Sequence, residues 1–169
     1  LGSRWVLTTF AAALCLVLGV QSAAAAALLH HNLDVSLDPT THTLAVRDRI
    51  AFPAGAPREV VVRLHPGLEP TVEGSAATIV GVGSNDAGSF TERYRLTLPP
   101  GADSVTLSYR GVIDHPLEQV GEEYARGQQE TRGTISDVGV FLSGSAAWYP
   151  QIEEGGLFTF TLAVDLPDG

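Results

Sequence analysis

The stretch FTFTLAVDL, residues Phe158–Leu166, carries the clearest pattern in the chain. Large apolar side chains occupy every second position, and threonine, alanine or aspartate stands between them. Strict alternation predicts a β-strand with one apolar face, because successive side chains of a strand point to opposite sides. That face would consist of Phe158, Phe160, Leu162, Val164 and Leu166.

Shorter versions of this pattern recur throughout the chain, separated by turn segments rich in Gly, Pro and Asp. No amphipathic helix of useful length follows residue 30. Many short strands joined by such turns predict an all-β fold, an antiparallel β-sandwich or barrel. The expected strands are Asn32–Leu37, Leu44–Phe52, Val60–Leu64, Thr78–Val82, Phe90–Leu98, Val105–Tyr109, Ile135–Leu142 and Phe158–Leu166.

Two features interrupt the regular pattern. Asp48 breaks an otherwise apolar strand face, so we expect either an edge position or a partner for its carboxylate. Residues Asp114–Gly133 are acidic and lack a clean period, which indicates an exposed loop. A loop of this length is either a binding or capping element or a solvated insertion.

The first 27 residues predict a secretory signal peptide. Arg4 precedes a long apolar run, and a tract of alanines ending at Ala27 offers a cleavage region. We therefore expect residues 1–27 to be a signal helix, residues 28–169 to be one domain, and the protein to be exported to the periplasm or beyond the cell. An uncleaved membrane anchor over Trp5–Leu29 is the alternative. Lipidation at Cys15 is disfavoured because Leu14 precedes it.

Composition limits the class of partner. The net charge is −9, and 44% of the residues are hydrophobic. An acidic surface repels phosphate backbones, so nucleic-acid binding is disfavoured, while the apolar content suffices for a packed core.

A search for catalytic motifs finds none. The chain contains no His-Glu-x-x-His, no cysteine pair, no Gly-rich phosphate loop and no Gly-x-Ser-x-Gly. His30 and His31 are adjacent, so on a strand their rings point to opposite faces, although a mobile tail at the new N-terminus is the simpler interpretation. A metal site built from His30, His42 and His65 is disfavoured, because metal ligands usually cluster in the sequence. The Glu122–Glu123 and Glu153–Glu154 pairs are interpreted as solvated charges. We therefore assign no catalytic residue and no metal ligand.

The order of several segments resembles the N-terminal domain of M1-family zinc aminopeptidases. The stretch His31–Leu44 is similar to the opening strand, Asp-Pro turn and His-x-Leu step of that domain, and Ser104–Gly111 is similar to its Leu-x-Ile-x-Tyr-x-Gly strand. The most specific match is Ala147–Pro150 followed by Phe158–Pro167, which resembles an aromatic-Pro step leading into a Phe-x-Leu-x-Val-x-x-Pro strand.

This resemblance implies a saddle-shaped β-sandwich that docks on a downstream catalytic domain and lines the substrate cleft. In that family the zinc and its His-Glu-x-x-His ligands belong to the downstream domain, where zinc activates water to attack a peptide carbonyl. Zinc and peptide substrate are therefore expected of the whole protein, and this chain alone is expected to be inactive. The residues expected to border the cleft are Phe141, Leu142, Ser143, Trp148 and Tyr149.

The sequence departs from the family at one position that has a role in substrate binding there. The N-terminal domain of the family often supplies a Glu or Gln to the substrate amino group, and the matching stretch Gly139–Gly144 contains neither. Two other hypotheses stay open: an inactive peptidase relative, or an extracytoplasmic β-sandwich binding or adhesion module with no enzymatic activity. Core packing is the alternative role for Trp148 and Tyr149.

Overall fold

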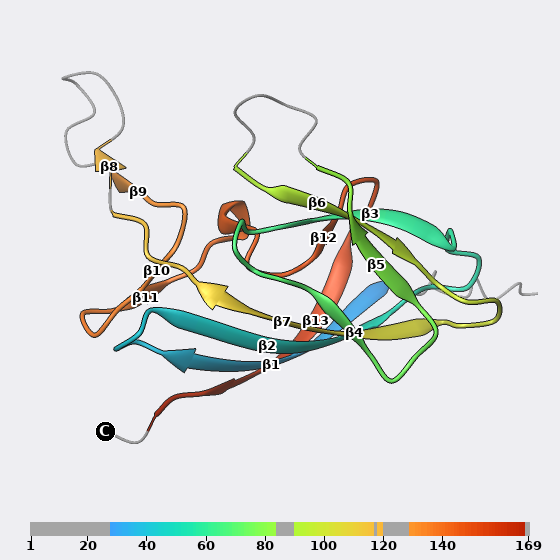
Figure 1. The fold of residues 1–169 in the computed structure, drawn as a ribbon, viewed down its shortest axis with the longest axis horizontal. Helices are drawn as coiled ribbons and strands as arrows, with labels where there is room; N and C mark the ends of the chain where they lie inside the picture. The colour runs from blue at the N-terminus through green and yellow to red at the C-terminus, as the bar shows by residue number, and fades with distance from the viewer. Residues whose placement is uncertain (1–27, 84–89, 117, 120–128, 168–169) are drawn as a thin grey trace, which may run out of the picture.

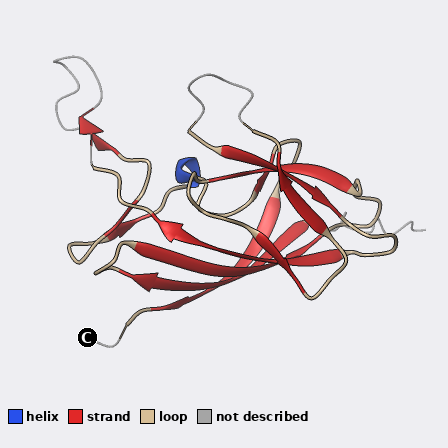
Figure 2. Cartoon of the chain, in the orientation of Figure 1, coloured by secondary structure: helices blue, strands red, loops and turns tan. Residues whose placement is uncertain are grey.

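The computed structural model describes residues 28–83, 90–116, 118–119 and 129–167, with side chains given outside 117–130. The predicted signal peptide, the Glu122–Glu123 pair and half of the acidic stretch lie outside the described residues. The described part is all-β, as predicted, and its only helical element is a 3-10 turn, η2 (Gly144–Ala146). Figure 2 shows strands joined by short loops throughout.

Two sheets form the body of the molecule (Figure 1). The five-stranded sheet has the order β13-β1-β2-β7-β4, and the four-stranded sheet has the order β12-β3-β6-β5. The five-stranded sheet consists of β13 (Phe158–Asp165), β1 (Leu29–Asp38), β2 (Thr43–Ala51), β7 (Ser104–Val112) and β4 (Thr71–Glu73). The four-stranded sheet consists of β12 (Gln151–Ile152), β3 (Glu59–Leu64), β6 (Glu92–Thr97) and β5 (Thr78–Gly81).

Two small ribbons lie beyond one end of the sandwich, at the left of Figure 1. They pair β8 (Glu118–Gln119) with β9 (Gln129–Glu130) and β10 (Thr134–Ile135) with β11 (Val140–Phe141). The second ribbon corrects one prediction, because Ile135–Leu142 is a tight hairpin and not one strand. Reciprocal backbone hydrogen bonds between Ser136 and Gly139 close its turn at 3.0 and 3.1 Å.

The core lies between the sheets and follows the predicted alternation. Along β1 every second side chain, Leu33, Val35 and Leu37, is buried, and the residues between them are exposed. Leu64 and Leu96 of the facing sheet pack into the same cluster. Since burial of such a side chain contributes about 1.5–3 kcal/mol, these two inner faces account for the sandwich.

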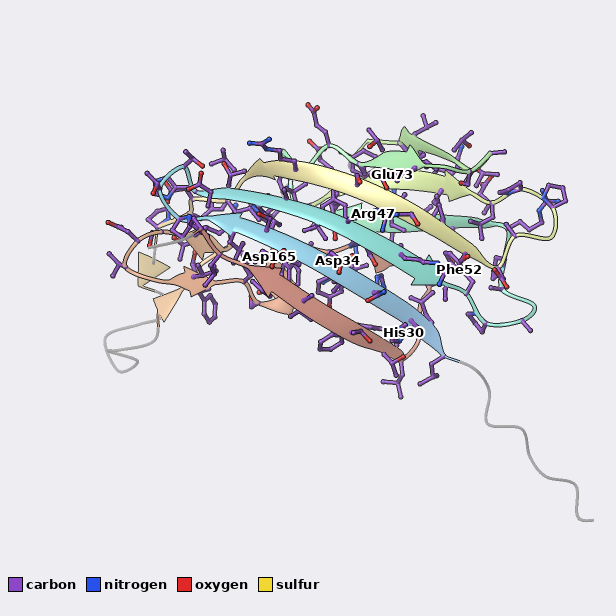
Figure 3. The ribbon with its side chains drawn as sticks, turned by 90° about the horizontal axis from the view of Figure 1, so that it is seen from below. His30, Asp34, Arg47, Phe52, Glu73 and Asp165 are labelled. Carbon is purple, nitrogen blue, oxygen red and sulfur yellow. The ribbon has the colours of Figure 1, made fainter. Side chains whose placement is uncertain are left out.

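One pairing is parallel. β13 runs alongside β1 in the same direction, with Leu162 opposite Leu33 and Val164 opposite Val35, while the other pairings within the two large sheets are antiparallel. A parallel neighbour needs a long connection, and almost the whole chain lies between these two strands. Figure 3 shows β7, β2, β1 and β13 side by side, with Asp34, Arg47 and Asp165 on the polar outer face.

Asp48 has a partner and is not at an edge. It lies on β2, a central strand, and its Oδ2 accepts a hydrogen bond from His31 Nδ1 at 2.7 Å. His31 also corrects the prediction of a mobile N-terminal tail, because it belongs to β1 and is 1% exposed. The prediction that His30 and His31 point to opposite faces is confirmed, since His30 bonds Thr159 Oγ1 on the outer side at 2.8 Å.

Candidate functional site

The segment predicted to border a cleft runs from β11 through η2 to β12. Phe141 is 54% exposed at the end of the small ribbon, whereas Leu142 packs against the core. Ser143 Oγ and Ser145 Oγ share a hydrogen bond of 2.7 Å on either side of Gly144. Within this segment Phe141 and, at 41% exposed, Val140 are therefore the apolar side chains that are presented outward.

Trp148 and Tyr149 are half-buried against the edge of the core. Their rings meet edge to face with centroids 5.2 Å apart, and Tyr149 also contacts His31 at 5.9 Å and Phe158 at 5.7 Å. Ala147, immediately before them, has φ = 49°, a left-handed conformation that turns the chain into this aromatic cluster. Both rings thus serve packing, and Tyr149 also lines a small cavity.

A buried polar pair lies beneath these rings. His31 and Asp48 are diagonal neighbours across β1 and β2 on the inner face, with 1% and 0% of their side chains exposed. Asp48 Oδ1 and the Tyr109 hydroxyl are buried without a hydrogen-bond partner among the described residues. Burial raises the pKa of Asp48, an effect that its hydrogen bond to His31 opposes. Burial also raises the pKa of Tyr109, and the charge of Asp48 is a second, smaller cause of this rise.

One hollow borders His31, and a second, larger one adjoins it. A cavity of ≈ 180 Å³ is lined by His31, Tyr149 and Phe158 together with residues 150–152 and 155–156. A larger hollow of ≈ 610 Å³ lies next to it, between the start of β1, the Phe52–Val61 region and the Ile152–Leu157 segment. Its lining is mostly apolar, so it suits an apolar group better than a charged one.

The charged edge of the larger hollow is a bidentate ion pair. Arg93 donates to both carboxylate oxygens of Glu153, each at 2.6 Å, and these hydrogen bonds lower the pKa of Glu153. Glu153 is therefore an ion-pair partner, which corrects the interpretation of Glu153–Glu154 as two solvated charges; Glu154 is exposed.

The three histidines considered as a metal site lie in different surroundings. His30 bonds Thr159 on the outer face, and His42 Nδ1 donates to the Ile135 carbonyl at 2.5 Å. His65 instead meets His115, a partner that the sequence did not indicate, with the two Nε2 atoms 3.1 Å apart. Burial lowers the pKa of His65, which favours the neutral ring. No group of three or more His, Cys, Asp or Glu side chains converges within the described ranges.

Strand β13, which carries the clearest alternation in the sequence, is exposed along its whole length. Its apolar residues share the inner face of the sheet with Leu33 and Val35, yet the four-stranded sheet does not cover them. Their exposed fractions are 39% for Phe158, 60% for Phe160, 43% for Leu162, 47% for Val164 and 64% for Leu166. We call these five residues the β13 apolar face.

Sequence reasoning missed three features of this region: the His31–Asp48 pair, the His65–His115 pair and the exposure of the β13 apolar face. Asp48 within an apolar strand was a usable signal for the first, because a buried carboxylate needs a partner. The other two depend on contacts between segments far apart in the chain, and no local pattern reports them.

Comparison with known proteins finds a similarity in structure and none in sequence. No protein-family model and no curated protein sequence matches the chain. Among solved structures it is similar to a crystal structure of a mutant M1 zinc metallopeptidase from Deinococcus radiodurans bound to a Tyr-Ser-Ala substrate, with 20% sequence identity and a TM-score of 0.45. The match covers 83% of this chain and 32% of that one, so the chain spans about a third of that protein. Among the described residues no helix is long and apolar enough to cross a membrane.

Proposed function

We propose that this chain is the non-catalytic N-terminal β-sandwich domain of an exported M1-like zinc metallopeptidase, which docks on the catalytic domain of the same polypeptide. The β13 apolar face is the observation that carries the proposal. The segment resemblance from Ala147 to Pro167 supplies the family.

The β13 apolar face has the character of a docking surface. Four of its five large apolar side chains form one row on β13, and Leu166 directly follows the strand. Phe141 and Val140 of β11 are also exposed, at 54% and 41%. Contiguous apolar surface of this kind marks contacts with another polypeptide, because exposing it to water costs roughly 25 cal/mol per Å². The opposite face of the same sheet carries charged residues, including the Arg47–Glu73 ion pair at 2.8 Å, and is suited to solvent.

The free edge of β13 adds a second means of attachment. β13 forms the end of its sheet, so the backbone groups on its outer side can pair with a further strand. A docked domain that adds a strand here would extend the sheet and cover the apolar row in one step. Long apolar edge strands aggregate when left open, which gives the native partner a clear physical role.

The peptidase zinc does not fit the residues of this chain. The sequence lacks His-Glu-x-x-His, and the described residues bring no three ligand side chains together. The proposal therefore places zinc, the catalytic residues and the peptide substrate with the catalytic domain. The contribution of this chain is a wall of the cleft, for which Phe141, Trp148 and Tyr149 are the candidates.

A second function has one observation in its favour. The ≈ 610 Å³ hollow is apolar, carries the Arg93–Glu153 pair at its edge and lies in this chain alone. An extracytoplasmic binding module for a small apolar ligand would use such a hollow without any further domain.

The reading frame beyond Gly169 is the first test. A Gly-x-Met-Glu-Asn strand followed by His-Glu-x-x-His and a later Glu is expected. A frame that continues without these ligands removes the peptidase proposal and leaves the binding module.

The docking surface is tested in the full-length protein with Phe160→Ser combined with Leu162→Ser. We expect faster proteolytic separation of the two domains and weaker aminopeptidase activity, because the apolar contact is lost. Val80→Ser is the matched control, since Val80 is an equally exposed apolar residue, at 60%, on edge strand β5. Equal behaviour of the two variants would show that β13 is not the docking face.

A further inference from the structure

Two loops at one end of the sandwich bring a pair of histidines together. His65 directly follows β3 of the four-stranded sheet, and His115 follows β7 of the five-stranded sheet. The two Nε2 atoms lie 3.1 Å apart, although fifty positions separate the residues in the sequence. The pair therefore connects the two layers of the fold.

The hydrogen bonding of His65 leaves Nε2 available as a ligand. Its Nδ1–H donates to the Pro66 carbonyl at 2.6 Å, and in a neutral ring this places the lone pair on Nε2. Histidines that bind metal usually hold the second ring nitrogen in this way, because the backbone carbonyl fixes both tautomer and orientation.

The separation of the two nitrogens suits one shared metal ion. With metal–nitrogen bonds of 2.0–2.1 Å, two imidazole ligands lie roughly 2.9 Å apart at a right angle and roughly 3.4 Å apart at a tetrahedral angle. The observed 3.1 Å falls between these values. The ring centroids are 5.1 Å apart and the ring planes are inclined at 53°. Each ring must turn away from the line that joins the two nitrogens for both lone pairs to point to one ion.

The surroundings hold both residues in place. His65 N–H donates to the Ala147 carbonyl at 2.7 Å, and His115 N–H donates to the Gly133 carbonyl at 2.9 Å. The Phe90 ring meets both imidazoles edge to face with centroids 5.0 Å away. Little conformational freedom remains to be lost when a ligand binds.

We propose that His65 and His115 form a two-histidine binding site for a late first-row divalent metal ion such as Zn²⁺, with water completing the coordination. Imidazole nitrogen is a preferred ligand of these ions. In the absence of metal, His115 Nε2–H donates to His65 Nε2; in the bound form His115 carries its hydrogen on Nδ1. The ion links the two sheets and is separate from any peptidase zinc.

The site is tested by calorimetric titration of the full chain with ZnCl₂ after treatment with EDTA, together with thermal unfolding with and without Zn²⁺. We expect one equivalent of Zn²⁺ to bind and to raise the melting temperature, because a ligand that binds only the folded state stabilises it. His115→Gln and His65→Gln should each weaken Zn²⁺ binding at least tenfold.

His30→Gln is the matched control, because His30 is part-exposed on the outer face and bonds Thr159. It should leave both the titration and the shift in melting temperature unchanged. Circular dichroism establishes that each variant is folded, and His115→Gln decides the question if the buried His65 cannot be replaced. A zinc isotherm for folded His115→Gln that matches wild type would mean that the two rings share only a hydrogen bond, and would overturn the proposal.

Discussion

The buried pair of His31 and Asp48 allows a sharp test of how this core tolerates charge. The two side chains are 1% and 0% exposed, and Asp48 Oδ1 has no partner among the described residues. We consider His31→Leu, Asp48→Val and the double variant. Each replacement is apolar and joins a row of buried neighbours that includes Leu33 and Ile50.

The expected loss of stability depends on which buried group is left without its hydrogen-bond partner. His31→Leu leaves a carboxylate in the core without its partner and should lower the free energy of unfolding by about 3–5 kcal/mol. Asp48→Val leaves one buried N–H without an acceptor and should cost about 1–3 kcal/mol. The double variant removes both polar groups and should lie within about 1 kcal/mol of wild type or exceed it, because apolar replacement of a buried pair is commonly neutral or stabilising.

Urea unfolding at pH 7 measures these three differences. Trp148 packs beside Tyr149, next to the pair, and its fluorescence reports the transition, with circular dichroism as the second probe. The thermodynamic cycle should give a coupling energy of at least 2 kcal/mol. Additive effects, with the double variant less stable than His31→Leu, would refute the argument that the unpaired Asp48 carboxylate causes most of the loss of stability in His31→Leu.

Three other predictions follow from the same structure. Burial raises the pKa of Asp48 above its ordinary 3.8, so the stability that this group contributes is complete below that pH and is lost as pH rises through the folded pKa. His31→Leu removes the hydrogen bond that opposes this rise, so the deficit of the variant in urea melts should become smaller as the pH is lowered from 7 toward 3.8. The hydrogen bond to Arg93 lowers the pKa of Glu153 below its ordinary 4.5, so the stability contributed by this group is present above that pH and is lost as pH falls. Glu153→Gln should therefore lower the free energy of unfolding by about 0.5–1 kcal/mol at pH 7 and by progressively less below pH 4. Gly111→Ala should lower the free energy of unfolding by about 2 kcal/mol or more in the same assay, because the new Cβ would collide with the Gly67 carbonyl. Gly139→Ala, which has no atom within 4 Å of the new Cβ, should lower it by under 1 kcal/mol.

The sequence predicted the strands of this fold where alternation was long. β2 and β13 match their predicted ranges to within one residue at each end, because side chains on one strand report directly which face is buried, whereas β1 and β7 extend beyond theirs. The short β4 was missed, since three residues are too few to show a period. The hairpin of β10 and β11 was read as one strand, although Ser136, Asp137 and Gly139 of its turn are all residues common in turns. Its two paired strands are only two residues long, which is too short to show a period.

The candidate site was less predictable than the fold, for a physical reason. His65 and His115 are isolated in the sequence, and their meeting depends on where β3 and β7 end in two different sheets. Asp48 could be recognised as needing a partner, but the choice of His31 among the histidines required the β1–β2 register, which pairs Leu33 with Asp48. Register is a tertiary property, and a shift of one residue would have placed His30 on the inner face.

β13 shows most clearly what alternation does and does not establish. The pattern of Phe158–Leu166 correctly predicts a strand with one apolar face, because that follows from the pleat alone. Burial of that face requires a second layer above it, and the four-stranded sheet ends at β12, which pairs with β3 and leaves β13 uncovered. A strand so apolar and so exposed is costly in water, and natural edge strands normally carry charges or prolines that prevent association. Within β13 the only such residue is Asp165, at its last position. The absence of protection along the rest of the strand is expected of a surface that another part of the polypeptide covers, and this is why the docking proposal depends on β13 and not on the polar outer face.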